Sequence, residues 1–295
     1  MTLAPMSEIL PRSMNTTLLT FAHALARLGP RTVLHSAAAL VITNGGLAQE
    51  LDEARDAPVE VAETAEERMT SGPPAKGKPW EAGWGFYPQH PTAWQIHFKS
   101  QLEQTKQGSG KIVFLGDSIT QGWGDTGKAA WTKHFEPMGA VNYGIGGDST
   151  RQVLWRVENG LLDGLSPELV VLKIGTNNLY DDFNAGSDEE IARGVETSVK
   201  AIFAKLPTTR VLLLGILPRQ NDWFSSRIGK INATISKLDD GKKVRFLDLD
   251  ARFEKTPGKG DVFEELFSGD KLHLSAKGYE TLAEAISPSV GEFVR

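Results

Sequence analysis

Five short apolar runs, separated by segments with helical spacing, constrain the fold of this chain more than any other feature. Each run is rich in branched side chains, as expected for a strand buried on both faces. The runs cover residues 112–115, 140–145, 169–174, 211–216 and 244–249. Helical patterns lie near 129–135, 150–158, 189–205, 224–238 and 276–293. Strands that alternate with helices in this way predict an α/β fold, with a parallel sheet covered by helices on both faces.

The first apolar run stops abruptly at Gly116-Asp117-Ser118. In open α/β sheets, ligands bind just outside the carboxyl ends of the strands. A serine at that position is presented to the ligand and is a candidate nucleophile. The same three residue types also make an ordinary turn at a strand end. The tripeptide alone therefore leaves both interpretations open.

Composition excludes several classes of function. The net charge is −5, so no basic excess is available to neutralise phosphates, which argues against nucleic-acid binding. The chain has no cysteine, which excludes disulfides, thiolate zinc sites and a cysteine nucleophile. Residues 122–128 have the spacing of a phosphate-binding loop, but the residue after the lysine lacks the required hydroxyl group. Gly144-Ile145-Gly146 begins like a dinucleotide-binding fingerprint, but Ser149 stands where that pattern needs its third glycine. Neither segment favours a nucleotide cofactor.

The N-terminal part differs in composition from the rest. Residues 1–48 combine a basic flank, a moderately apolar run and the ending Gly46-Leu47-Ala48, a pattern typical of a cleavable signal peptide. Polar residues within the run argue against a stable transmembrane helix. An organelle transit peptide and a plain N-terminal helix of a cytoplasmic protein remain alternatives. The favoured location is a bacterial periplasm or the medium, because an exported protein without cysteine fits a bacterial envelope.

The remaining chain divides into a linker and one domain. Residues 49–79 carry few large apolar side chains and predict a flexible linker. A globular domain is expected over residues 80–295. At its start, Trp94, Phe98 and Leu102 follow a helical spacing, which predicts a helix that packs on the sheet before the first strand.

Three further segments place glycines or polar side chains beside strand ends or helix starts. Gly146-Gly147, after the second run, allows the backbone to approach a ligand closely. Asn177 follows the third run, and its amide is a candidate donor. Asp270 precedes His273 by three residues, a spacing that lets the carboxylate orient the imidazole. With Ser118, these are the parts that acyl transfer needs, although each alone is more often a turn or capping residue.

Taken together, the segments resemble the SGNH hydrolases, also called the GDSL esterase/lipase family. The resemblance covers residues 111–286 and rests on four blocks: Gly116-Asp117-Ser118, Gly147-Asp148, Gly175-Thr176-Asn177 and Asp270-x-x-His273. Residues 142–150 with Val153-Leu154-Trp155-Arg156 are most similar to the platelet-activating-factor acetylhydrolase catalytic-subunit branch. This resemblance implies a three-layer flavodoxin-like fold with a five-stranded parallel sheet in the order 2-1-3-4-5.

The resemblance also implies a role for each site residue. Ser118 attacks the ester carbonyl, His273 accepts and returns the proton, and Asp270 holds the imidazole. The backbone N–H groups of Ser118 and Gly147 and the side-chain amide of Asn177 form the oxyanion hole. No metal and no cofactor enter this scheme.

Other side chains near these blocks receive structural interpretations. Asp117 and Asp148 are expected to hold the loops that carry Ser118 and Gly147. The favoured interpretation of His97 is a buried structural histidine. Trp123, Trp131 and Phe183 are candidates for lining a sugar or lipid cleft, with the aromatic core as the favoured alternative for Trp131.

The expected function is hydrolysis of short-chain esters, above all acetyl esters, with carbohydrate O-acetyl esters as one substrate class. Two alternatives remain open: a phospholipid acylhydrolase or lysophospholipase that uses the same site, and a non-catalytic binding module of the same fold. The expected partner is a small-molecule or glycan ester, with no nucleic acid and no stable membrane span. The oligomeric state is not decided by the sequence.

Overall fold

A computed structural model of the chain describes Thr64, Met69 and residues 77–83, 91–108, 110–179 and 185–294. The expected signal peptide over 1–48, most of the expected linker over 49–79, and Phe183 lie outside these residues. By its internal contacts the chain divides between Val61 and Ala62. The structural description therefore concerns the second of these units.

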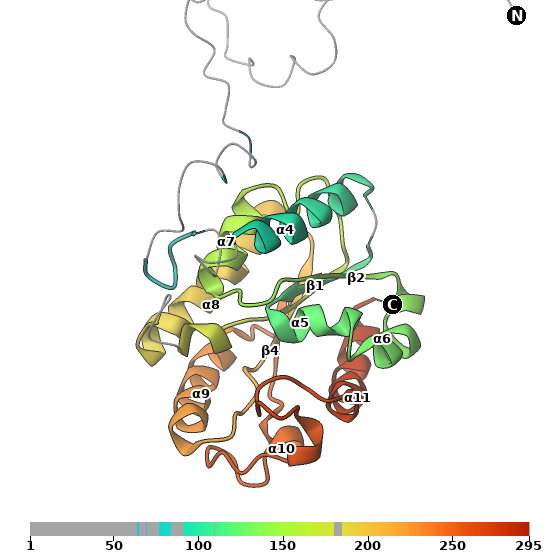
Figure 1. The fold of residues 1–295 in the computed structure, drawn as a ribbon. Coiled ribbons are helices and arrows are strands. Elements are labelled where there is room, and N and C mark those ends of the chain that lie inside the picture. The colour runs from blue at the N-terminus through green and yellow to red at the C-terminus, as the bar shows by residue number, and fades with distance from the viewer. Residues whose placement is uncertain are drawn as a thin grey trace, which may run out of the picture. The chain divides into compact units, whose positions relative to one another are not determined.

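In the described part of the chain, five parallel strands form one sheet in the order β2-β1-β3-β4-β5 (Figure 1). The strands are β1 (Ile112–Gly116), β2 (Ala140–Gly144), β3 (Leu169–Lys173), β4 (Arg210–Leu214) and β5 (Val244–Leu247). All five strands expected from the sequence are present, and the predicted strand order is confirmed. Four of the strands end one or two residues earlier than the apolar runs, because the last apolar residues of those runs already belong to the loops at the sheet edge.

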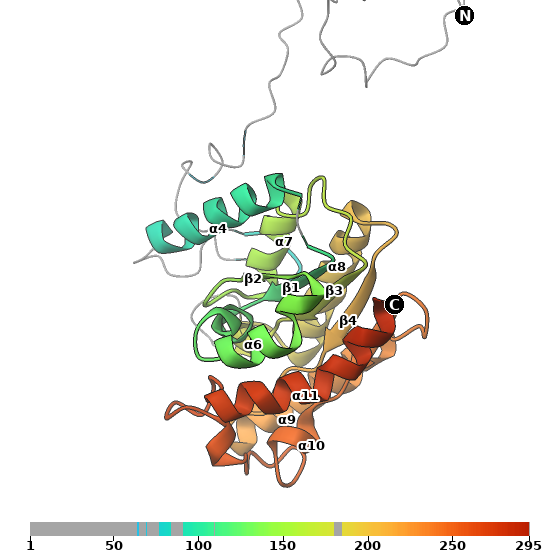
Figure 2. The ribbon, with the colours of Figure 1, turned by 90° about the vertical axis from the view of Figure 1, so that its right-hand side faces the viewer.

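Helices cover both faces of the sheet (Figure 2). Side chains of α4 (Pro91–Lys106), α7 (Thr150–Glu158), α8 (Asp188–Lys205) and α9 (Asp222–Ile235) pack in the core of one face. Side chains of α6 (Lys128–His134), α10 (Asp250–Phe253) and α11 (Ala276–Phe293) pack in the core of the other. The short helix α5 (Ser118–Gln121) follows β1, and the 3₁₀ turns are Gly122–Gly124, Glu136–Met138, Thr176–Leu179, Ser236–Leu238 and Glu264–Leu266.

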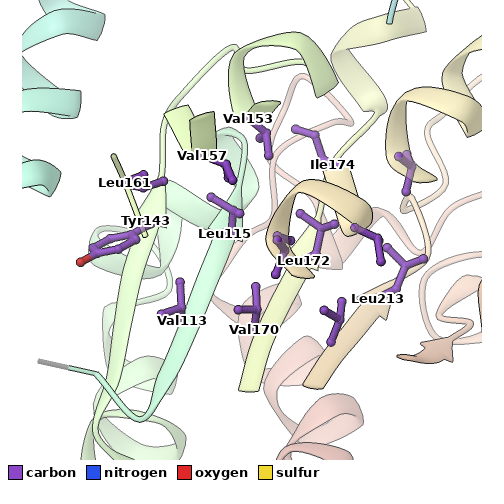
Figure 3. Packing of buried hydrophobic residues seen from close by; sticks show 14 of the residues in the cluster. Val113, Leu115, Tyr143, Val153, Val157, Leu161, Val170, Leu172, Ile174 and Leu213 are labelled. Carbon is purple, nitrogen blue, oxygen red and sulfur yellow. The ribbon is translucent and has the colours of Figure 1, made fainter. Parts of the chain in front are cut away.

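The core consists of two layers because successive strand residues point to opposite faces. Val113 and Leu115 of β1 belong to one layer, whereas Ile112 and Phe114 belong to the other. Figure 3 shows the first layer, in which Val113 and Leu115 lie beside the aligned residues of β3. Burial on both faces explains why the strands read as continuous apolar runs.

The second layer contains two tryptophans that the sequence analysis assigned either to a ligand cleft or to the core. Trp123 and Trp131 are 2% and 7% exposed and pack against Phe114, with ring centroids 6.3 and 5.0 Å from it. Both tryptophans are therefore core residues, as was favoured for Trp131. Helix α11 continues through Pro288 without a break.

Residues before α4 make specific contacts with the domain. The hydroxyl of Thr150 donates to the Pro79 carbonyl at 2.6 Å, and the Arg151 guanidinium donates to the Glu81 carbonyl at 3.0 Å. Met69 is only 2% exposed, and its carbonyl accepts a hydrogen bond from Gln95 at 3.2 Å. At Met69 and at 77–79, inside the expected linker, the chain thus contacts the domain, while the rest of the linker stays a prediction.

We expect removal of residues 1–61 to leave the melting temperature unchanged, and removal of residues 1–83 to lower the free energy of unfolding. Burial of a Met69-sized side chain contributes about 1.5–3 kcal/mol, and each lost hydrogen bond about 1 kcal/mol. Thermal and urea denaturation of the two truncated proteins measure the difference. Equal stability of both would contradict a structural role for Met69 and residues 77–83.

Candidate active site

The segments singled out in the sequence meet at one edge of the sheet. Ser118 begins α5 two residues after the end of β1, Gly147 lies in the turn after β2, and Asn177 lies in the 3₁₀ turn after β3. The carboxyl ends of parallel strands share an edge, and β1 lies between β2 and β3. Ser118 is therefore flanked by the loops that carry Gly147 and Asn177.

A continuous chain of hydrogen bonds joins Ser118, His273 and Asp270. The Nε2 atom of His273 lies 2.8 Å from the Ser118 hydroxyl oxygen, and Nδ1 lies 2.6 Å from Oδ2 of Asp270. With its proton on Nδ1, the ring donates to the carboxylate and accepts from the serine hydroxyl. This is the arrangement in which an imidazole removes the proton of an attacking hydroxyl.

The loop before α11 holds the Asp270 carboxylate from several sides. Oδ1 accepts hydrogen bonds from the Ser268 hydroxyl at 2.6 Å and from the backbone N–H groups of Leu272 and His273 at 3.0 and 2.9 Å. Partial burial would raise the pKa of Asp270, but the hydrogen bonds from Ser268, the His273 ring and these N–H groups outweigh it and hold the pKa well below its usual value. The side chain that faces the imidazole is therefore an ionised carboxylate.

The turn that carries Ser118 is built for a close approach of two strands. A Cβ on Gly116 would lie 2.2 Å from the Lys173 carbonyl oxygen, so only glycine fits at the end of β1. Asp117 caps α5, because its Oδ1 accepts from the Ile119 N–H at 2.9 Å. The Ser118 N–H is one of the first N–H groups of this helix, which have no partner within it. It is thus available to a ligand oxygen.

A second contact fixes α5 relative to the helix that follows His273. The Tyr279 hydroxyl of α11 donates to the Ile119 carbonyl at 2.8 Å, and its ring packs on Trp123 at 4.8 Å. Because α11 begins three residues after His273, this contact ties the base to the nucleophile. Sequence reasoning did not identify Tyr279, since an aromatic residue in a helix signals only burial.

The other two predicted donors are oriented by their neighbours. Gly147 has φ +83°, a conformation that favours glycine, and Gly146 N–H donates to the Gln121 side chain at 2.5 Å. The Asn177 amide nitrogen donates one hydrogen to the Asp148 carbonyl at 2.8 Å, which leaves its second hydrogen for another acceptor. The three predicted donors, on Ser118, Gly147 and Asn177, thus lie at the ends of three adjacent strands.

A buried ion pair lies under these loops. The Arg156 side chain of α7 is 2.6 Å from Oδ2 of Asp148, and both are fully buried. Arg156 also donates to the carbonyls of Gly116 and Tyr143, at 3.0 and 2.8 Å, and Trp94 donates to Asp148 at 2.7 Å. Burial raises the pKa of Asp148 to about 6, while Arg156 and the Trp94 hydrogen bond oppose that shift.

These contacts agree with the loop-holding roles expected for Asp117 and Asp148. They also assign Arg156 a role that the sequence did not reveal, because an arginine in a helix reads as a surface residue.

The expectation for His97 is wrong, because its side chain is exposed. The buried stripe of α4 consists of Trp94, Phe98, Gln101 and Thr105, and His97 lies beside it. Its ring is 3.5 Å from the amide nitrogen of Gln121, the residue that holds Gly146.

The described residues contain neither a metal-holding cluster nor a membrane-spanning helix. Over the described ranges, no group of three or more His, Asp or Glu side chains is arranged to hold a metal ion. No helix within those ranges is long and apolar enough to cross a membrane.

Comparison with known proteins identifies similar chains. The sequence model of the GDSL-like lipase/acylhydrolase family matches residues 114–281. The platelet-activating factor acetylhydrolase IB subunit alpha2 of Rattus norvegicus is 31% identical over 196 residues, which is 65% of this chain and 81% of the relative. The subunit beta homolog of Drosophila melanogaster is 35% identical over 168 residues, or 56% of this chain and 72% of the relative.

A solved structure shows the same fold. The GDSL-like lipase from Bacteroides thetaiotaomicron aligns with a TM-score of 0.55 at 21% identity, and the alignment covers 66% of this chain and 97% of that chain. At this identity, the likeness concerns the fold alone.

We expect the stability conferred by Asp270 to depend on pH. The folded-state pKa of Asp270 is depressed, so its contribution is present above the unfolded pKa of about 4 and is lost as the pH falls toward the folded value. The wild type should melt at a higher temperature than Asp270→Asn above about pH 5, and the difference should shrink below about pH 4. Ser268→Ala, which removes one donor, should show a smaller effect of the same sign. A difference that persists unchanged to pH 3 would argue against this interpretation.

Proposed function

Because the chain belongs to the GDSL-like lipase/acylhydrolase family and is thus an ester hydrolase, we propose that it acts as a serine esterase on short-chain, chiefly acetyl, esters. The observation that carries this proposal is the hydrogen-bonded chain from the Ser118 hydroxyl through His273 to Asp270. The nucleophile comes from the turn after β1, the base and its orienting carboxylate come from the loop before α11, and the three groups meet within hydrogen-bonding distance. A non-catalytic binding module would have no need of this alignment.

The first half of the reaction forms an acyl-enzyme. Ser118 Oγ attacks the ester carbonyl carbon while its proton passes to His273 Nε2, and Asp270 stabilises the imidazolium. The negative charge that develops on the carbonyl oxygen is accepted by the N–H groups of Ser118 and Gly147 and by the free amide hydrogen of Asn177. When the tetrahedral intermediate collapses, the bond to the leaving alcohol breaks, and His273 returns the proton to that oxygen.

The second half regenerates the enzyme. A water molecule attacks the acyl carbon with His273 again as the base, and the acid leaves as Ser118 regains its proton. Each donor in the oxyanion hole binds the substrate oxygen more strongly in the transition state, when that oxygen carries negative charge, than in the bound ester. Loss of one such donor typically raises the barrier by about 3–4 kcal/mol. The protein groups present suffice for every proton transfer in this scheme.

The proposed substrate class is an acetyl ester, including O-acetylated carbohydrate. The relatives named as acetylhydrolases support the acetyl group. The carbohydrate part rests on the proposed export of the protein from a bacterial cell and on the breadth of the family. A lipid ester, cleaved by a phospholipid acylhydrolase or lysophospholipase on the same residues, is the second candidate, and the relatives' names fit it in part.

We expect Ser118→Ala and His273→Ala each to remove nearly all esterase activity, by about 10⁴-fold or more, and the double variant to lose no more than either. The two side chains act as one unit, so their losses do not add. Hydrolysis of p-nitrophenyl acetate measures all three variants. Ser236→Ala, which removes a hydroxyl at the end of α9, serves as a control with wild-type activity. Additive losses, or activity that survives Ser118→Ala, would refute the assigned pair.

We expect p-nitrophenyl acetate to be hydrolysed at least about 10-fold faster than the octanoate ester, because a pocket shaped for an acetyl group excludes added methylenes. Release of acetate from acetylated oligosaccharides and from acetylated lipids, compared at equal acetyl concentration, separates the two leaving groups. A preference for acetylated lipid would transfer the assignment to the second candidate. A preference for the octanoate ester would refute the acetyl assignment.

A further inference from the structure

A lysine ammonium is buried beneath the turn that carries Ser118. Lys173 is the last residue of β3 and the register partner of Gly116 on β1. Its side chain is 4% exposed, and Nζ lies 3.6 Å from Oδ2 of Asp117, which is fully buried. Among the described residues, neither of these two atoms has a hydrogen-bond partner. The contact is therefore an ion pair between two buried side chains, and the mechanism above uses neither charge directly.

Lys173 is not needed to fill the core. The residues at the ends of the other strands are glycine or leucine, and the remainder of β3 is Leu169-Val170-Val171-Leu172. Methionine would occupy a similar volume at this position without taking a charge out of water, and desolvation of a charge in a protein interior is unfavourable. Burial lowers the pKa of Lys173, the Asp117 carboxylate opposes that shift, and the nearby Arg219 guanidinium adds to it. The charge at this position is thus energetically unfavourable unless Asp117 compensates it.

Asp117 and Lys173 belong to a larger set of buried charges, which we call the buried charge cluster: Asp117, Asp148, Arg156 and Lys173. Asp148 pairs with Arg156 at 2.6 Å, and the Asp117 charge also acts on both Asp148 and Arg156. These four side chains carry two negative and two positive charges, so their own formal charge is zero. Arg219, 7% exposed, is a further buried cation that acts on Lys173 and lies outside this set.

The cluster lies next to the oxyanion donors. Asp117 directly precedes Ser118 in the chain, and Asp148 directly follows Gly147. The backbone N–H groups of Ser118 and Gly147 are the proposed donors to the oxyanion. A net negative charge beneath these two groups would oppose the negative charge that develops on the substrate oxygen. In a site of low dielectric constant this opposition is strong.

We propose that Lys173 is a positioning residue for ester hydrolysis, which acts through Asp117 by keeping the buried charge cluster neutral beneath the oxyanion donors. This inference rests on the proposed function of Ser118. Oδ1 of Asp117 caps α5 through the Ile119 N–H, and Lys173 faces the other carboxylate oxygen. Lys173 thereby allows a fully buried carboxylate to hold the nucleophile turn without adding net negative charge.

The test compares variants that change the charge of the cluster in opposite directions. Lys173→Met leaves the cluster with one excess negative charge, and Asp117→Asn leaves one excess positive charge while retaining an oxygen that can accept from Ile119. The double variant restores neutrality. Each full-length protein is titrated with a fluorophosphonate that labels reactive serine, so that kcat for p-nitrophenyl acetate is expressed per active site. Lys237→Met is the control for the same substitution at an exposed position.

We expect Lys173→Met to lower kcat per titrated site by about 10-fold or more, with KM within about twofold of the wild type, because only the transition state carries the opposed charge. Asp117→Asn should show a smaller decrease in kcat per titrated site, and the double variant should recover most of the decrease caused by Lys173→Met. A purely structural role predicts fewer titratable sites but an unchanged kcat per site.

Several outcomes would overturn the inference. They are wild-type kcat per site in Lys173→Met, a double variant no faster than Lys173→Met, and a double variant that yields no titratable protein. If Lys173→Met itself fails to fold while the double variant folds and turns over, neutrality of the cluster is supported. Failure of the proposed function is seen separately, as labelling or activity that persists in Ser118→Ala.

Discussion

The contacts of Arg156 are the constraint on which the rest of the site depends. One guanidinium, fully buried, binds the carboxylate of Asp148 and the carbonyls of Gly116 and Tyr143, which lie at the ends of β1 and β2. The Gly116 carbonyl also accepts from the Ile145 N–H at 3.1 Å, so Arg156 adds a second donor there and supplies a buried donor to the Tyr143 carbonyl. A buried ion pair contributes little net stability compared with an apolar core, but removal of one partner is strongly destabilising. Arg156 therefore specifies geometry: it fixes the two strand ends from which Ser118 and Gly147 project.

The two halves of the proposed catalytic machinery differ in how they are held. The donors and the nucleophile lie on short turns that follow buried strands, with Asp117, Asp148 and Asn177 nearly inaccessible to solvent. His273 and Asp270 lie on a loop, and their side chains are 43% and 50% exposed. Hydrogen bonds within that loop and the Tyr279 contact to α5 replace burial as the source of order. Such a division suits acyl transfer, because the oxyanion donors must be preorganised, whereas the imidazole must exchange protons with both the leaving alcohol and water.

Lys173 and Arg156 illustrate how charge enters a parallel α/β core. Lys173 lies at the end of an apolar strand, where a hydrophobic residue is expected, and Arg156 lies in a helix, where an arginine is expected to be exposed. Each is instead buried against a carboxylate, Asp117 or Asp148, that is next in the chain to Ser118 or Gly147. Where a protein breaks local sequence rules of this kind, the place is often a functional or strained site.

The sequence by itself determined the elements, their parallel arrangement and the blocks that carry chemistry. The apolar runs have strand length, and the first three are followed by Gly116-Asp117-Ser118, Gly146-Gly147 and Asn177. Both features are local in the chain and can be recognised without a structure. The family resemblance already implied that Ser118, His273 and Asp270 act together, but only the tertiary structure gave their distances and the other distant groups that meet. The 2.8 Å contact between His273 and Ser118 joins residues 155 positions apart, and the partners of Lys173 and Arg156 come from different strands and helices. The predicted burial of His97 is wrong, because packing of Trp94 and Phe98 sets the side of α4 that faces the sheet. Periodicity reports which residues share a face, whereas distances across the sheet edge follow from strand order and packing, which no local pattern contains.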